Sequence, residues 1–382
     1  MNLLALLVML LPGLVLILIF FWLKNKQLIL ARVFLISGIS LVAFITLLWI
    51  LDLSDSLAHS HFNSISSIVS GSLAVPSDEN QQQYLLMGLS NAAEGIAQYA
   101  SAYPEKDSFC LSQLRSIVDF VTDDANYPSA TNKRLWKNNY FYLIHLNSIL
   151  ASYEKTLGRD SISPLHQNVN NYLADGIVMS RYKNIQTLKG DNSYWPADNS
   201  ILISSLYETD QLSHTNKAVR ASKDWSNFVA SEVSYDGSSL PCSAFTEKNK
   251  CKEMPHGTHL ATMVSGLSHC APALSKKIWK EFKNKYKNGK LGIFASFEQY
   301  HPKEITPAYA SNLLHPLDSV SPAIAALKAA ANYGDRLTYF QLTNQLWLND
   351  VFAKRPSGRT LKGYQWKDFL ELSMRFNAET VF

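Results

Sequence analysis

Residues 3–51 consist of two apolar runs, LLALLVMLLPGLVLILIFFWL (3–23) and LILARVFLISGISLVAFITLLWIL (28–51), which are separated only by the basic segment KNKQ (24–27). Each run is about as long as the ~20 residues that an α-helix needs to cross a hydrocarbon core of ~30 Å. The sequence therefore predicts a transmembrane helical hairpin over residues 1–53.

Basic residues near the turn of this hairpin predict its orientation. Lys24, Lys26 and Arg32 lie in or beside the connecting loop, and no charged residue precedes Lys24. Because basic loops are retained on the cytoplasmic side, we expect this loop inside and both ends of the chain outside. The predicted location is the inner (plasma) membrane, with the large domain periplasmic or otherwise extracytoplasmic.

A cleavable signal peptide is the alternative interpretation of the first run. No positive region precedes the run, and no small-x-small cleavage site follows it, so two retained helices fit better. Neither run contains Asp, Glu or His, which argues against an ion path or proton relay through the membrane. We expect an anchor in the lipid bilayer that also offers a docking surface for other envelope membrane proteins.

The rest of the chain is long enough for one large domain with its own core. We divide it into a linker helix over 54–81 and a domain over 82–382. The net charge is only +4, and Lys and Arg are dense only within 276–290, so a nucleic-acid partner is not expected. No phosphate-binding or dinucleotide motif occurs, and no cofactor is predicted.

Hydrophobic periodicity predicts pairs of amphipathic helices with little strand. The expected pairs are 82–102 with 111–122, 134–157 with 164–182, 198–211 with 216–233, 258–269 with 272–286, 319–333 with 337–349, and 365–376 with 56–73.

The connections between these helices alternate in length. Links within pairs are short, whereas links between pairs are long and rich in Gly, Pro and aromatic residues (183–197, 234–257, 287–318 and 354–364). Ordered domains rarely contain several such loops unless the loops are functional. The pattern predicts an all-α chain whose large domain is (α/α)6-toroid-like, with the long loops forming the rim of a central cleft.

Two segments carry a resemblance to known families. YWPADNSI (194–201) with LYETD (206–210), and LDSVSPA (317–323), resemble repeat units of α/α-toroid glycoside hydrolases, polysaccharide lyases and epimerases. The pair Cys242 and Cys251 is similar to the active-site cysteine pair of the linalool dehydratase-isomerase family, which shares the toroid. The resemblance covers about 82–349 and is architectural. It implies acid/base chemistry in the central cleft, on a glycan or on a small apolar substrate.

The cysteines allow two interpretations. In an oxidising compartment Cys242 and Cys251 are the natural disulfide partners, because they close a short polar loop. If they are reduced and close to a base, they could instead act as acid, base or nucleophile. Cys110 and Cys270 lie in helix-like contexts and are expected to be free thiols.

Asp198 and Asp318 are the first candidate catalytic residues. Each lies at a predicted helix N-terminus, where free N–H groups and the helix dipole stabilise a carboxylate. Each is therefore open to interpretation as a helix cap or as one member of the carboxylate pair of sugar chemistry.

The segment PHGTH (255–259) contains two histidines three residues apart. His256 is a candidate for proton transfer or substrate orientation. His259 is interpreted either as substrate-binding or as a packed structural histidine. A metal site is not predicted, because a third ligand and an HExxH spacing are missing.

A loop after two phenylalanines supplies the remaining candidates. Glu298, Tyr300 and a neighbouring histidine could provide the acid and base of a lyase or epimerase, and the loop could equally be exposed and inert. Tyr194 and Trp195, together with Tyr300 and His259, are the predicted substrate-binding residues.

Three functional hypotheses follow. The first is a membrane-anchored toroid enzyme that acts on an envelope glycan or another extracytoplasmic substrate as a hydrolase, lyase or epimerase. The second is a hydro-lyase similar to linalool dehydratase-isomerase, and the third is a non-catalytic toroid subunit of a cell-envelope complex. Convergence of Asp198, His256, Glu298 and Asp318 on one cleft would favour an enzyme, and a cleft plugged by side chains would favour the subunit.

Overall fold

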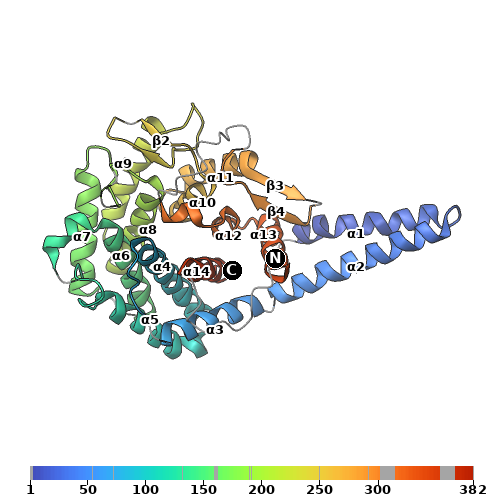
Figure 1. The fold of residues 1–382 in the computed structure, drawn as a ribbon, viewed down its shortest axis with the longest axis horizontal. Coiled ribbons are helices and arrows are strands. Elements are labelled where there is room, and N and C mark those ends of the chain that lie inside the picture. The colour runs from blue at the N-terminus through green and yellow to red at the C-terminus, as the bar shows by residue number, and fades with distance from the viewer. Residues whose placement is uncertain are drawn as a thin grey trace.

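The computed structural model describes residues 3–53, 55–71, 73–130, 132–158, 162–188, 190, 192–248, 250–290, 292–301, 315–352 and 366–381. In these ranges the chain is mostly helical, with two small two-stranded sheets. The predicted predominance of helix is therefore confirmed. Figure 1 shows a rounded helical body from which a long helical hairpin projects.

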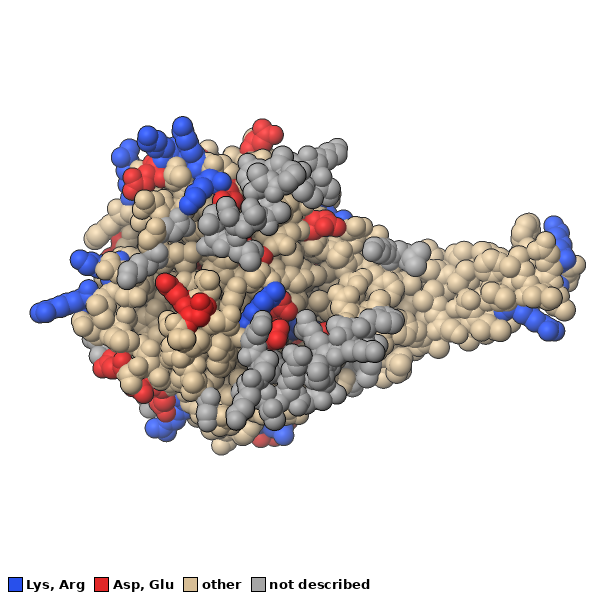
Figure 2. Space-filling model, viewed as in Figure 1, with Lys and Arg blue, Asp and Glu red and all other residues tan. Residues whose placement is uncertain are grey.

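The projecting hairpin consists of α1 (Leu3–Leu23) and α2 (Leu28–Leu53). Among the described residues, these are the two helices long and apolar enough to cross a membrane. The helices approach closely at two glycines, because a Cβ on Gly38 would lie 2.8 Å from the carbonyl oxygen of Gly13. Figure 2 shows no charged side chain along the visible sides of the projection and basic side chains gathered at its far end.

The body is built from helices that follow one another in the predicted pairs. Their bounds are α3 (Ser56–Ser70), α4 (Glu79–Ala102), α5 (Asp107–Thr122), α6 (Tyr140–Leu157), α7 (Pro164–Met179), α8 (Pro196–Ser213), α9 (Lys217–Glu232), α10 (Gly257–Leu267), α11 (Pro272–Tyr286), α12 (Pro322–Asn332), α13 (Arg336–Phe352) and α14 (Trp366–Glu379).

Alternate helices form a closed cycle of contacts. Helix α4 packs on α6, α6 on α8, α8 on α10, α10 on α12, α12 on α14, and α14 returns to α4. The helices α5, α7, α9, α11 and α13 each contact the cycle helix that precedes them, and α3 contacts α14. The members of every predicted pair are thus in contact.

Local sequence signals explain where several helices begin. Asp78 accepts the N–H of Gln81 at the start of α4, and Ser163 accepts that of His166 at the start of α7. Side-chain acceptors at these positions satisfy N–H groups that lack a partner within the helix. Proline also occupies the first turn of α7, α8, α11 and α12, where its missing N–H costs no helical hydrogen bond.

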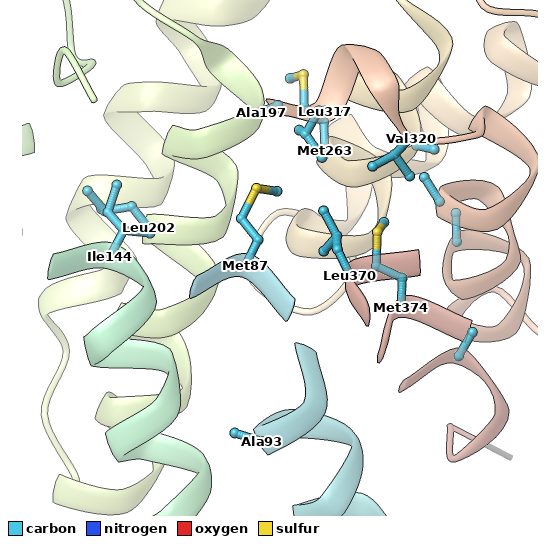
Figure 3. Packing of buried hydrophobic residues seen from close by; sticks show 14 of the residues in the cluster. Met87, Ala93, Ile144, Ala197, Leu202, Met263, Leu317, Val320, Leu370 and Met374 are labelled. Atoms are coloured by element: carbon cyan, nitrogen blue, oxygen red, sulfur yellow. The ribbon is translucent and has the colours of Figure 1, made fainter. Parts of the chain in front are cut away.

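Apolar side chains fill the middle of the body. Figure 3 shows Met87 of α4 facing Leu370 and Met374 of α14, with Met263 of α10 and Leu317 close by. The closest approach in this region is between α4 and α14, where Gly88 and Gly95 each lie against a phenylalanine ring. The core is therefore formed by the inward faces of the cycle helices.

Short elements interrupt the predicted pattern. The expected helix over 134–157 is divided into a 3-10 helix, η2 (Lys133–Asn138), and α6. The long links hold the antiparallel pairs β1 (Ala244–Phe245) with β2 (Cys251–Glu253), and β3 (Lys287–Lys290) with β4 (Phe294–Phe297), as well as the 3-10 helix η4 (Pro316–Ser319). The predicted loop 354–364 and the middle of 287–318 lie outside the described residues.

Candidate functional site

A buried cluster of acidic and histidine side chains lies where α8, α10 and η4 begin. Asp198 is in the first turn of α8, His256 directly precedes α10, and His259 is in the first turn of α10. Asp318 belongs to η4, which contacts α10. Packing of α10 against α8 and η4 thus brings together side chains that are up to 120 positions apart in the sequence.

Asp318 interacts with three histidines. Its Oδ1 lies 2.9 Å from Nε2 of His259 and 4.0 Å from Nε2 of His256. Its Oδ2 accepts the backbone N–H of His315 at 2.9 Å, which closes a capping box. Burial alone raises the pKa of Asp318, but the hydrogen bond from His259 and the neighbouring rings hold it below its ordinary value. Asp318 is therefore ionised at neutral pH.

Asp198 forms the second carboxylate–histidine pair. Its Oδ2 accepts hydrogen bonds from Thr187 Oγ1 at 2.5 Å and from His315 Nε2 at 3.0 Å. Burial opposes ionisation, but these bonds and the proximity of His315 leave the pKa of Asp198 below its ordinary value. The helix-cap interpretation of Asp198 is wrong, because Trp195 is the capping residue of α8 and the Asp198 carboxylate is used in tertiary contacts.

Contacts with backbone N–H groups show which ring nitrogen carries the proton in two of the histidines. Nδ1 of His315 accepts the N–H of Leu317 at 3.1 Å, so in the neutral ring Nε2 carries the proton and donates it to Asp198. Nδ1 of His256 likewise accepts the N–H of Thr258 at 3.3 Å. The proton of His256 is therefore on Nε2, and this buried nitrogen has no hydrogen-bond partner among the described residues.

The ring of His259 has the complementary arrangement. Its Nε2 donates to Asp318, which leaves Nδ1 as a buried acceptor for which the described part of the chain supplies no hydrogen-bond donor. Burial lowers the pKa of His256 to about 3 and lowers that of His259, so both rings are neutral at pH 7. Unpaired buried polar atoms are uncommon in folded proteins, and here a donor and an acceptor belong to rings whose centres are 5.3 Å apart.

The geometry also bears on whether a metal could bind. One ligand atom from each of His256, His259 and Asp318 lies within 4.8 Å of the others. A metal-bound imidazole nitrogen must present a lone pair, but the contact from Thr258 places the proton of His256 on the nitrogen that faces Asp318. The arrangement therefore fits proton chemistry better than metal binding.

Aromatic side chains surround the cluster. The ring centre of Trp195 lies 4.6 Å from that of His315 and 5.3 Å from that of His259, and the ring centre of Tyr300 lies 4.9 Å from that of His256. Trp195 is fully buried, so it packs the histidine rings.

Two predicted site residues lie outside the cluster. The Glu298 carboxylate accepts a hydrogen bond from Asn288 of β3 at 3.4 Å, so Glu298 does not converge with Asp198, His256 and Asp318. Its main chain does approach the site, because a Cβ on Gly257 would collide with the Glu298 carbonyl oxygen. Tyr194 pairs with Phe245 through the backbone and stacks on its ring at 5.1 Å.

A cavity of about 360 Å³ adjoins the cluster. Tyr140, Thr187 and Tyr194 line it together with several amide side chains. Thr187 is also the donor to Asp198, so the cavity wall is hydrogen-bonded to the cluster. A second space of about 70 Å³ lies among the cycle helices and includes His145 in its lining.

Three contributors were not identified from the sequence. His315 and Thr187 bind Asp198, and the nearby His145 is buried with an unpartnered Nδ1. One sequence signal was available for His315, because it precedes Asp318 by three residues, the spacing of a capping box.

The predicted disulfide between Cys242 and Cys251 is confirmed. It closes the turn between β1 and β2, and the adjacent Ser243 accepts the backbone N–H of His256 at 2.8 Å. Bonded sulfurs cannot serve as acid, base or nucleophile, so the hydro-lyase hypothesis loses the residues on which it depended. Cys110 and Cys270 are free thiols.

No protein-family model matches this sequence, and the search of curated proteins gives no match either.

Proposed function

We propose that this protein is a membrane-anchored, periplasmic α/α-toroid enzyme that acts on an envelope glycan by acid/base chemistry. The closed cycle of contacts from α4 to α14, with a second helix beside each member, supports a toroid. The apolar hairpin α1–α2 supports an anchor, and the basic residues at its turn support a domain outside the cytoplasm.

One observation carries the enzyme proposal: an unpaired donor and an unpaired acceptor lie beside two ionised carboxylates in one buried cluster. The acceptor is Nδ1 of His259. Burial lowers the pKa of this ring, and Asp318, which accepts the proton on Nε2, offsets part of that lowering. The donor is Nε2–H of His256. Asp198 and His315 form the second pair and join the cluster to the cavity through Thr187.

These groups suit proton abstraction better than hydrolysis. In the proposed reaction, Nδ1 of His259 removes a proton from a carbon next to a carbonyl or carboxylate group of the sugar. Nε2–H of His256 donates a hydrogen bond to the oxygen on which negative charge develops, a role that a neutral imidazole can fill. Among the reactions expected for an α/α toroid, this arrangement favours a lyase or an epimerase. In a lyase, the electrons of the enolate then break the C–O bond at the next carbon, and the departing glycosidic oxygen takes the proton from the His259 imidazolium. In an epimerase, water protonates the opposite face of the carbon, and His259 releases its proton to solvent. The tyrosines and amides that line the adjacent cavity suit a hydroxyl-rich substrate.

Solvent-deuterium incorporation tests the proposal directly. The full-length protein in nanodiscs is incubated in D₂O with a panel of uronate-containing envelope polysaccharides, and the sugars are analysed by mass spectrometry. We expect exchange or elimination with the wild type and at least a 100-fold loss in His259→Gln and Asp318→Asn, because general base catalysis contributes factors of this order.

The chain offers a matched control in the buried pair His166 and Glu154, whose side chains are 2.5 Å apart. His166 bonds Thr209 at its other nitrogen, so this pair is fully satisfied and lies outside the candidate site. His166→Gln should lower stability without removing exchange. Loss of exchange in this variant at unchanged folded fraction would contradict the assignment to His259.

A non-catalytic envelope subunit is the second candidate, and burial favours it. The side chains of His256 and His259 are only 2% and 1% exposed, so a substrate reaches them only after some rearrangement. This alternative predicts no exchange by the wild type, and full complementation of a deletion strain by His259→Gln and by Asp318→Asn.

A further inference from the structure

One face of the base of the α1–α2 hairpin is covered by the helical body, whereas Leu7 and Leu47 at the same level are exposed. Met9 of α1 and Ile45 of α2 are buried in one apolar cluster with Ile293 and with Phe340 of α13. The hairpin side chains in this cluster extend from Leu6 to Leu10 and from Leu41 to Trp49. Figure 1 shows the start of α1 beside α13 and β4.

On the side that faces the body, the uncovered part of the hairpin is too short to cross a bilayer. On that side it comprises residues 11–23 of α1 and 28–40 of α2, while the opposite side is exposed as far as Leu7 and Ile50. At 1.5 Å per residue, each of these segments is only about 20 Å long. The hydrocarbon core is about 30 Å thick. About 10 Å of the core must therefore lie at the level where the hairpin is already covered by protein.

We propose that the body is seated in the outer leaflet, with the α13 surface around Phe340 and the β3–β4 turn at Ile293 below the lipid headgroups. This inference rests on the proposed membrane anchoring and adds a second lipid contact to it. The occupant of this surface is the bilayer that surrounds the hairpin, because the protein surface continues directly from the lipid-exposed faces of α1 and α2.

Aromatic side chains agree with this depth. From Leu28 at the turn to Trp49, α2 rises about 32 Å, which matches one hydrocarbon thickness. Trp347 of α13 is half-buried, and its ring centre lies 5.7 Å from that of Phe44 on α2. Tryptophan is enriched at the boundary between headgroups and acyl chains, so Trp49 is suited to mark that boundary. Trp347, at the level of Phe44, then lies about 7 Å inside it.

A spin label on α13 measures how deeply this surface of the body lies in the bilayer. Leu348 follows Trp347 and is half-buried, so a nitroxide on Leu348→Cys should be tolerated. Cys110 and Cys270 are first replaced by alanine, and the full chain is reconstituted in nanodiscs of phosphatidylcholine and phosphatidylglycerol. Collision with oxygen, which concentrates in hydrocarbon, is compared with collision with a water-soluble nickel chelate.

The controls are labels on Leu18, which is 66% exposed on the hairpin, and on Val219, which is 63% exposed on α9 of the body. We expect the Leu348 label to resemble Leu18, with a ratio of oxygen to nickel collisions several-fold above that of Val219. The Leu348 label could instead give the collision ratio of Val219 while Leu18 gives that of hydrocarbon. That result would overturn the proposed seating of the body but not the membrane anchor, because the bilayer would then be thinned around a short hairpin. If Leu18 also matches Val219, both the seating and the anchor are overturned.

Discussion

At the scale of single residues, the site depends on which histidine nitrogen carries a proton. His256 and His315 both use Nδ1 to accept a backbone N–H at a helix start. The same contact that begins the helix therefore directs Nε2–H into the cluster. His259 has no such contact and donates through Nε2 to Asp318. Helix capping and the chemistry of the site thus share the same side chains.

Burial of neutral histidines predicts a loss of stability in acid. Burial lowers the pKa of His145 from 6.5 to about 4 and that of His256 to about 3. Below pH 6.5 the unfolded chain binds protons that the folded chain does not, so the stabilisation is fully present above pH 6.5 and is lost as the pH falls towards 3–4.

Each such histidine contributes a slope of up to about 1.4 kcal/mol per pH unit in that window. Denaturation of wild type and His145→Gln between pH 7 and pH 4 measures it. We expect the free energy of unfolding to depend less steeply on pH in the variant than in the wild type. Identical slopes would show that His145 binds a proton equally in the folded and the unfolded state.

At the scale of elements, α4 and α14 pack closely in the middle of the body. A Cβ on Gly95 would lie 2.7 Å from Cδ1 of Phe376 and 3.1 Å from Cα of Asn377. Overpacking of this kind typically costs about 1–3 kcal/mol, and better helix propensity returns only about 0.5–1 kcal/mol. We therefore expect Gly95→Ala to destabilise the protein by about 1–2 kcal/mol in equilibrium denaturation.

Gly176 of α7 is the matched control. Its Cβ would meet the end of the Ile185 side chain at 3.1 Å, and that flexible group can move aside. Gly176→Ala should be neutral or slightly stabilising. Equal effects at the two positions would argue that the α4–α14 contact adapts as easily as a side-chain contact does.

The β1–β2 turn connects the disulfide to the site. Closing a loop of this length contributes about 2–3 kcal/mol on the chain-entropy estimate. Because Ser243 next to Cys242 holds the N–H of His256, we expect reduction to loosen the start of α10 as well. Hydrogen exchange with and without reductant should show faster exchange in 242–259, with Cys242→Ser/Cys251→Ser as the non-reducible comparison. Unchanged exchange at 256–259 would show that the disulfide does not stabilise the start of α10.

At the scale of the whole molecule, the proposed orientation of the body depends on the charges at the turn of the hairpin. Lys24 and Lys26 lie in the turn, and Arg32 lies one helical turn into α2. Positively charged loops stay in the cytoplasm, so a reporter fused after Phe382 should be active if it is a periplasmic phosphatase and dark if it is a cytoplasm-only fluorescent protein.

A double substitution provides the comparison for this topology. Lys24→Glu/Lys26→Glu removes most of the positive charge from the turn and should reduce the fraction of outward-facing bodies. Bright fluorescence of the wild-type fusion would place the body in the cytoplasm, where the Cys242–Cys251 bond would be reduced.

Local sequence patterns were sufficient to predict the apolar hairpin, the helix pairs and the Cys242–Cys251 bond. These features depend on neighbours in the chain: run length, periodicity over a few turns, and a short loop between two cysteines. The sequence also identified Asp198, His256, His259 and Asp318 as candidates, because each lies at a helix start that local signals reveal.

Which of these candidates lie together depends on how distant helices pack. The contacts of α10 with α8 and η4 placed His315 between Asp198 and Asp318, whereas the Glu298 carboxylate turned towards Asn288. Packing between distant segments decides which ring nitrogen of each histidine carries the proton. It also buries His145, His256 and His259 and thereby lowers their pKa values, and it sets the level at which the body meets the hairpin. Local sequence patterns do not encode such distances, because they arise only when the helices close into a cycle.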